Sequence, residues 1–311
     1  MGQYNYSIII PHYNCVCLLK RCLASIPLRD DVQVIVVDDN SDESEVLQMK
    51  ELMYVYPQHT FIFLQKNIGG GAARNIGLKH ATGKFVVFAD ADDFFNYCIN
   101  NILDEYADYS GDIVFFNAIS LDSNTFLPSI RSWQLECLHR NYIVDRNKAE
   151  LCFRFLFGEP WAKIIRRDFI NVHNITFEET PFHNDTLFSY MTGFYAQEIK
   201  VDNRALYCIT IRQGSISTNN SITTQFIRLR IFSQKNKFLR DHQIKVFDEI
   251  MLWPFKKFIW DYDWENLSKC FAIAKQYGFS PLFVLKQLFI KKIYKKNNTN
   301  WADGHDYSPQ I

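Results

Sequence analysis

Three acidic residues lie close together after an apolar, strand-like run, in the stretch FVVFADADDF. They are Asp90, Asp92 and Asp93. Neighbouring carboxylates repel one another and resist leaving water, so such a cluster needs either open solvent or a bound cation. Taken alone, it is more often a solvated turn. The D-x-D spacing can also direct two carboxylates toward one hard cation, with a diphosphate supplying further ligands.

Two other stretches have a comparable chemistry. VIVVDDNSD ends an apolar run in acid, which is either a solvated strand end or a place where a carboxylate such as Asp39 accepts hydrogen bonds from a nucleoside. NIGGGAARNIG is a glycine loop that opens a helix and permits close backbone approach. It is not a GxxxxGK[ST] phosphate loop, because no Lys-Ser or Lys-Thr follows, and Arg74 takes the last glycine place of GxGxxG.

The predicted elements bring these stretches together. Apolar runs of strand length alternate with helix-length segments through the first 120 residues: YSIIIP, DVQVIVVDD, TFIFLQ, KFVVFAD and DIVFFNAI. This alternation predicts a parallel α/β sheet. Ligands of open α/β sheets bind at the carboxyl edge of the strands. We therefore expect residues 11–14, 38–42, 67–74 and 90–93 to meet there.

The later part of the chain has a different pattern. Residues 121–148 are predicted to form a surface excursion, after which NKAELCFRFLFG resumes helical spacing. PWAKIIRRDFI and ALYCITIRQGSIS are predicted to contain strands, and FEETPFHNDTLFSYM a loop that runs into a helix. From about residue 222 the pattern is helical and basic. We expect a catalytic domain over residues 1–220 and a helical, basic region over residues 221–311.

Composition narrows the class of protein. The apolar content of 48% is ample for a packed core. Basic and acidic residues balance at 34 each, but residues 221–300 hold 15 Lys or Arg against 6 Asp or Glu. That asymmetry favours an acidic site in the first part and an anionic surface contact in the second. The eight cysteines include no CxxC pair and no apolar run is long enough to span a bilayer, so we expect a cytoplasmic protein with reduced thiols.

In combination, PHYN, VVDDNSD, NIGGGAARNIGLKHATG and FADADD resemble the family 2 glycosyltransferases of the GT-A fold, from residue 7 to about residue 217. The resemblance implies a mixed, mainly parallel sheet flanked by helices, with a C-terminal helical appendage. It also implies inverting transfer of a sugar from a nucleotide sugar, with a UDP-sugar favoured, to an acceptor hydroxyl in bacterial surface-polysaccharide biosynthesis.

The same resemblance implies the residues that bind the donor. Tyr13, with Pro11 in its P-x-YN element, is expected against the donor base. Asp39 is expected to bond to uracil or ribose, and Arg74 to lie near the base. Asp90 and Asp92 are expected to handle ribose and a divalent metal, Mn²⁺ or Mg²⁺, while Asp93 receives no assigned role.

The second half carries its own part of the resemblance. WAKIIRRDFI resembles the W-x-K segment of the family, and FHNDTLF resembles its E-D-x-x-F element, which places the catalytic base at Asp185. Asn184 stands where an acid is common. A helix cap is the alternative role for Asp185. IRQGSIS resembles a late loop that closes on the diphosphate, which makes Arg212 and Ser215 candidates for diphosphate binding. An ordinary strand followed by a turn is the alternative interpretation of this stretch.

The expected partners are a nucleotide-sugar donor and a glycan or lipid-linked glycan acceptor, with no nucleic acid. LWPFKKFIW and LFIKKIYKK place aromatic and apolar residues beside lysines, which suits either an ordinary packed helix or peripheral contact with the inner face of the cytoplasmic membrane. Two rival functions stay open. They are a sugar nucleotidyltransferase and a noncatalytic subunit that binds a nucleotide sugar.

Overall fold

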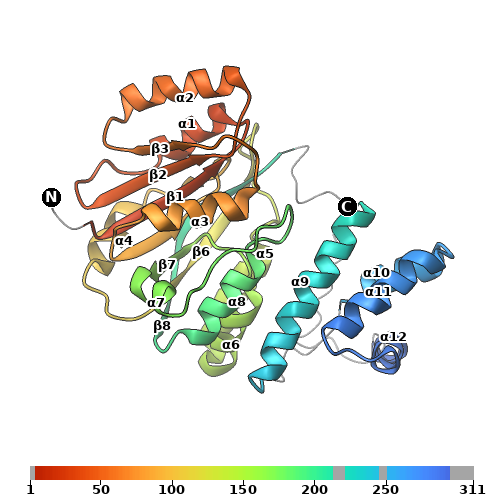
Figure 1. Cartoon of the computed structure of the whole chain (residues 1–311). Helices are drawn as coiled ribbons and strands as arrows, with labels where there is room; N and C mark the ends of the chain where they lie inside the picture. Colours follow the sequence, from red (N-terminus) through yellow and green to blue (C-terminus); the bar gives the residue numbers. More distant parts are fainter. Residues whose placement is uncertain (1–3, 213–220, 245–250, 295–311) are drawn as a thin grey trace. The chain divides into compact units, whose positions relative to one another are not determined.

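The computed structural model describes residues 4–212, 221–244 and 251–294. The chain divides into two compact units, Met1–Ile216 and Ser217–Ile311, of which each is described by itself (Figure 1). The division falls four residues before the boundary that the sequence predicts.

The first unit is built on an eight-stranded sheet with the order β3-β2-β1-β4-β7-β6-β8-β5. Strand β1 pairs in parallel with β2 and β4, and β2 pairs in parallel with β3. Strand β7 is antiparallel to both of its neighbours, while β6 runs parallel to β8. The mixed, mainly parallel sheet is therefore confirmed. Its strands are β1 (Tyr6–His12), β2 (Val32–Asp38), β3 (Thr60–Phe63), β4 (Phe85–Phe88), β5 (Phe94–Phe95), β6 (Ile113–Asp122), β7 (Lys163–Arg166) and β8 (Ile199–Ile211).

Helices cover the sheet because its central strands are apolar on both faces. Ile8, Ile9 and Ile10 are consecutive in β1 and all fully buried, as expected for strands with parallel neighbours. Helix α3 packs across β1 and β2, and α6 packs against both α5 and α8 (Figure 1). The helices of this unit are α1 (Val16–Ala24), α2 (Glu43–Val55), α3 (Gly70–His80), α4 (Ile99–Tyr106), α5 (Trp133–Val144), α6 (Arg146–Leu156), α7 (Arg167–Val172) and α8 (Thr186–Tyr195).

A close approach fixes α3 on the sheet. A Cβ atom at Gly77 would lie 2.3 Å from the Cγ2 atom of Ile9, so a larger residue would push the helix away from β1. The glycine loop before α3 is thereby held at the carboxyl ends of β1 and β2.

The surface excursion predicted for residues 121–148 is wrong over much of its length. Helix α5 occupies Trp133–Val144, and α6 begins at Arg146. Leu135 and His139 of α5 are buried, whereas Ile143 and Val144 are exposed. Since apolar residues lie on the exposed side of this helix, the sequence gives no clean amphipathic period there.

The second unit has its own small core. It consists of α9 (Ile222–Asp241), α10 (Trp253–Trp260), α11 (Trp264–Gln276) and α12 (Pro281–Tyr294). Leu229, Phe255, Phe258 and Cys270 form the centre of its apolar cluster. The helical appendage is confirmed. Among the helices that the structure describes, none is long and apolar enough to cross a membrane.

Candidate active site

The sequence motifs meet at the carboxyl edge of the sheet. Tyr13 follows β1, Asp39 follows β2 and Asp90 lies just beyond β4. These strands are adjacent and parallel, and the backbone N–H of Asp39 donates to the carbonyl of His12 at 2.8 Å. Tyr13 is 48% exposed, which leaves its ring open to a ligand.

A buried network supports the loop that carries Tyr13. The Nδ1 atom of His12 lies 2.8 Å from Asp38 Oδ1, and the Ser41 hydroxyl donates to the same oxygen at 2.5 Å. The Nε2 atom of His12 accepts from the backbone N–H of Cys15 at 3.2 Å. Nδ1 therefore carries the proton, and His12 is a structural residue of this loop.

Asp39 fixes the glycine loop. Its two carboxylate oxygens accept hydrogen bonds from the backbone N–H groups of Ile68 and Gly69, at 2.7 and 2.8 Å. Burial raises the pKa of Asp39, although these two donors oppose the shift. Gly69 has a φ of +91°, a conformation that favours glycine. Sequence reasoning did not anticipate this loop-holding role.

Strand β8 holds the D-x-D turn in place. The backbone N–H of Asp90 donates to the hydroxyl of Tyr207 at 2.8 Å, and Asp93 Oδ1 accepts from the backbone N–H of Thr210 at 2.7 Å. Burial, together with the charges of the other two acids, raises the pKa of Asp93 well above its usual value. The Trp161 ring stacks on Tyr207 with centroids 5.4 Å apart. Asp93 is thus a buried residue that anchors the turn.

Two arginines bind the middle acid of this turn. Arg21 of α1 donates to the backbone carbonyl of Asp92 at 2.5 Å. Arg212, which directly follows β8, donates from Nε to Asp92 Oδ2 at 3.2 Å. Burial and the charge of Asp90 raise the pKa of Asp92, while Arg212 opposes this. The predicted diphosphate residue Arg212 is therefore beside the predicted metal acid. Ser215 lies outside the described residues.

The acids fit a cation that binds together with a diphosphate. Asp90 and Asp92 offer carboxylate oxygens, the ligands that Mg²⁺ and Mn²⁺ prefer. The described part of the chain contains no group of three or more His, Cys, Asp or Glu residues that could hold a metal ion. A cation that is bound through one or two carboxylates and substrate phosphates needs no such group.

Arg74 lies between the D-x-D turn and the loop that precedes α8. Its Nη2 atom donates to Asp90 Oδ1 at 2.5 Å, and its Nη1 atom donates to Asn184 Oδ1 at 2.9 Å. The guanidinium lies over the Phe177 ring, 5.5 Å from its centroid, and the residue is only 7% exposed. Asn184 is the position where the sequence departs from the family pattern, and its amide oxygen serves as the acceptor here.

Asp185 is the residue just before α8. Its side chain makes no cap hydrogen bond with that helix. Burial raises the pKa of Asp185 to about 6; the charge of Arg74 opposes this, while Glu159 and Asp90 add to it. A carboxyl with a pKa near 6 is mostly ionised at neutral pH and well suited to accept a proton. The fold thus brings Asp185 within electrostatic range of Asp90.

Sequence reasoning missed two charged neighbours of Asp185. Lys163 of β7 is buried, and its Nζ atom donates to the Phe157 carbonyl at 2.9 Å. Burial lowers the pKa of Lys163 to about 7, although the charges of Glu159 and Asp185 oppose this. The W-x-K pattern points to Lys163 without giving it a role. No sequence signal marks Glu159.

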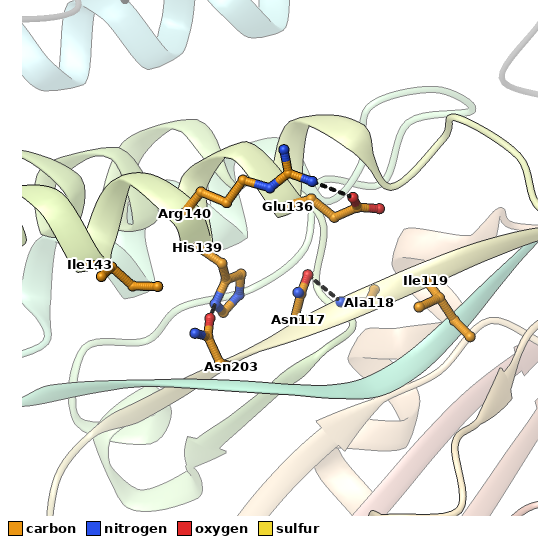
Figure 2. A pocket seen from close by; sticks show the side chains of 8 residues that line it. All are labelled: Asn117, Ala118, Ile119, Glu136, His139, Arg140, Ile143 and Asn203. Carbon is orange, nitrogen blue, oxygen red and sulfur yellow. Dashed lines mark hydrogen bonds and ion pairs between the residues drawn. The ribbon is translucent and has the colours of Figure 1, made fainter.

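A separate cavity of about 420 Å³ lies under α5 (Figure 2). The ring of His139 and the side chain of Asn203 face each other there, with 3.0 Å between Nδ1 and Oδ1. None of the predicted site residues lines this cavity. The site at the sheet edge is therefore defined by its side chains and not by this cavity.

The sequence of this chain is similar to those of known proteins. The model of the family described as Glycosyl transferase family 2 matches residues 7–172. The uncharacterized glycosyltransferase YibD of Escherichia coli K12 is 26% identical over 309 residues, which cover 94% of this chain and 87% of YibD.

Two solved structures have a similar fold. TarS of S. aureus in complex with UDP-GlcNAc aligns with a TM-score of 0.64 at 20% identity, over 88% of this chain and 81% of TarS. The mannosyltransferase PcManGT of Pyrobaculum calidifontis, in complex with GDP-Man and Mn²⁺, aligns with a TM-score of 0.56 at 16% identity, over 96% of this chain and 82% of that one. Such low identities show the fold alone.

Proposed function

The chain belongs to glycosyl transferase family 2, and we propose that it transfers a sugar from a UDP-sugar to an acceptor hydroxyl with inversion, in cell-surface polysaccharide biosynthesis. Residues 1–220 would form the catalytic domain. The observation that carries this proposal is the position of Arg74, which donates to Asp90 on one side and to Asn184, the neighbour of Asp185, on the other. One arginine thus contacts both the proposed donor-binding acid Asp90 and the residue next to the candidate base.

Asp185 acts as the general base in this proposal. It accepts the proton of the acceptor hydroxyl while that oxygen forms a bond to the anomeric carbon, on the face opposite the diphosphate. The bond between the anomeric carbon and the phosphate oxygen breaks, and its electron pair leaves with the nucleoside diphosphate. A single displacement through an oxocarbenium-like transition state inverts the anomeric centre and needs no covalent enzyme intermediate.

The donor would lie along the sheet edge. The exposed ring of Tyr13, with Pro11 at the end of β1, would contact the base. Asp39 would bond to uracil or ribose through the lone pairs that Ile68 and Gly69 leave free. Arg212 and Ser215 would contact the diphosphate.

Asp90 and Asp92 would hold Mn²⁺ or Mg²⁺, and Asp90 would also contact the ribose. When bound, the cation neutralises negative charge on the leaving diphosphate. Arg212, which is now beside Asp92, offers a second positive charge at the same place. PcManGT, which has a similar fold, is recorded with Mn²⁺ and GDP-Man.

The acceptor is proposed to be a glycan or a lipid-linked glycan, reached at the inner face of the cytoplasmic membrane. In the second unit Trp253, Trp260 and Trp264 are 54%, 79% and 62% exposed, and Lys256 is exposed beside them. Aromatic and lysine side chains suit the interfacial region of an anionic leaflet. The stretch LFIKKIYKK lies partly outside the described residues.

Vesicle sedimentation tests the membrane proposal. Protein should bind anionic vesicles more than neutral ones at low salt, and Trp253→Ser with Trp260→Ser should weaken that binding. Equal binding to both kinds of vesicle would remove membrane contact from the proposal and leave an ordinary packed helical unit.

A donor screen tests the catalytic proposal. Thermal shifts of the purified protein with UDP-, GDP- and dTDP-sugars, with and without manganese, should show the largest stabilisation by a UDP-sugar with metal. Slow hydrolysis of that donor without acceptor would support a transferase. Release of pyrophosphate from a nucleoside triphosphate and a sugar phosphate would indicate a nucleotidyltransferase instead. Binding with neither reaction would indicate a noncatalytic subunit.

A further inference from the structure

The contacts of Arg74 differ from those expected of a residue that binds a nucleobase. Its two terminal nitrogens already donate to Asp90 and Asn184, and the Phe177 ring covers one face of its guanidinium. Only 7% of the residue is exposed. Its contacts are with the two acid-bearing elements of the site.

Helix α3 and the loop before α8 are interlocked around Arg74. Asn75 exchanges two hydrogen bonds with the backbone of Phe177, at 3.0 and 2.8 Å. A Cβ atom at Gly71 would lie 2.1 Å from the carbonyl oxygen of Glu178, so the loop touches the helix backbone. The backbone N–H of Glu178 in turn donates to the carbonyl of Asn184 at 2.9 Å. The loop that ends at Asp185 is therefore fastened to α3.

Charged groups from four elements interact electrostatically with Asp185. They are Arg74 from α3, Asp90 from the end of β4, Glu159 from the segment before β7, and Lys163 from β7. Of the two cations, Arg74 has the larger influence, since it is the first charge to oppose the burial of Asp185. An arginine stays protonated at every working pH, so this influence is constant.

We propose that Arg74 is a positioning residue that links the two acids of the reaction. One end of its guanidinium orients Asp90, and the other end orients the loop that carries Asp185. This inference rests on the proposed role of Asp185 as the base. It replaces the sequence-based expectation that Arg74 contacts the nucleobase.

The pH profile of kcat/KM distinguishes a positioning role for Arg74 from a contact with the donor, because the loss of a donor contact does not change how Asp185 titrates. Arg74→Met should move the acid limb of the profile to higher pH by about 1 unit, the size expected when a carboxylate loses an adjacent arginine. Arg74→Lys should keep the limb near its original pH while kcat falls, since the charge remains and the two-ended contact is lost. The donor Kd, measured at each pH, shows whether the variant also changes donor binding through Asp90.

Arg29 offers a matched control. Like Arg74 it donates to carboxylate and asparagine oxygens, at 2.8 Å to Asp31, 2.6 Å to Asp104 and 2.9 Å to Asn100. It precedes β2 and so lies at the amino edge of the strands, away from the site. Arg29→Met should leave the acid limb where it is.

An unmoved acid limb in Arg74→Met, with a weaker donor Kd, would overturn the inference and make Arg74 a donor contact. If circular dichroism shows that Arg74→Met does not fold, Asn184→Ala provides the second test. It removes the loop acceptor of Arg74, together with a 3.3 Å hydrogen bond from Asn184 Nδ2 to the Thr180 carbonyl, and it keeps the bond of Arg74 to Asp90. It should lower kcat with the donor Kd unchanged, and unchanged kcat would overturn the positioning role. Near-normal transfer by Asp185→Asn, in contrast, would refute the assigned base and not these contacts.

Discussion

Arg212 donates to the side chain of Asp92 across 3.2 Å, so the acid that we assign to the metal has a positive partner in the free protein. A cation must therefore compete with this arginine for Asp92. This pairing also gives Arg212 a place within reach of any diphosphate that the cation binds.

Asp92→Asn should leave the fold intact, because Asp92 lies in a turn outside the strands and its side chain bonds to Arg212. It should weaken manganese-dependent UDP binding at least tenfold, since the amide cannot supply a charged ligand. Calorimetric titration with and without manganese measures this. Equal metal-dependent affinities in the variant and the parent protein would exclude Asp92 as a ligand.

Local sequence patterns were enough to predict β1, β2 and β4, because their runs of Val, Ile and Phe are buried on both faces, but they did not mark the two-residue strand β5. They were not enough for α5, where Ile143 and Val144 are exposed and obscure the helical period. The resemblance to the family motif predicted Asp185 as the base, but it did not predict which residues surround Asp185. Contacts such as Arg74 to Asn184 and Asp90 to Tyr207 join residues more than 100 positions apart. No local pattern encodes such pairs, since only the completed sheet brings them together.

Tyr207→Phe tests the support of the D-x-D turn. The change removes the hydroxyl that accepts from the backbone N–H of Asp90, and it leaves that partly buried donor without its partner. We expect a loss of about 1–3 kcal/mol in the free energy of unfolding together with weaker donor binding. Chemical denaturation and donor titration measure the two effects.

Tyr106→Phe is the control for this experiment, because it removes a 2.9 Å hydrogen bond to Asp202 and does not contact the D-x-D turn. It should lower stability without changing the donor Kd. Equal losses of donor affinity in both variants would mean that the effect reflects general destabilisation and not support of Asp90.

The buried carboxyl of Asp185 should lower the free energy of unfolding at neutral pH. Its pKa of about 6 in the folded protein exceeds the value of about 3.9 expected in the unfolded chain. Folding therefore binds a proton more tightly, and the cost of the ionised form appears as pH rises from about 4 to above 6. Asp185→Asn should raise the Tm at pH 8 and have little effect at pH 4. A lower Tm at pH 8 would contradict this direction.

Catalysis by Asp185 should follow the same ionisation. The base must be deprotonated, so kcat/KM should fall about tenfold per pH unit below pH 6 and level off above it. Initial rates between pH 4.5 and 8.5 measure this limb. A limb that persists unchanged in Asp185→Asn would belong to another group.

Asp185→Asn provides the decisive test of the base, because it nearly preserves size while removing basicity. Transfer should fall roughly 10²- to 10⁴-fold, the usual contribution of a positioned base, while the UDP-sugar Kd changes by no more than a few fold. A helix-capping role predicts no change, since Asn caps as well as Asp. The structure makes that alternative weaker, because the side chain of Asp185 makes no cap hydrogen bond.

If transfer by Asp185→Asn with a competent acceptor stays near normal, the search for the base moves to Glu159, whose charge acts on both Asp185 and Lys163. Glu178 and Glu179, the nearest preceding acids in the same loop, are the further candidates, and the Glu179 side chain accepts a hydrogen bond from Asn75 of α3 at 3.4 Å.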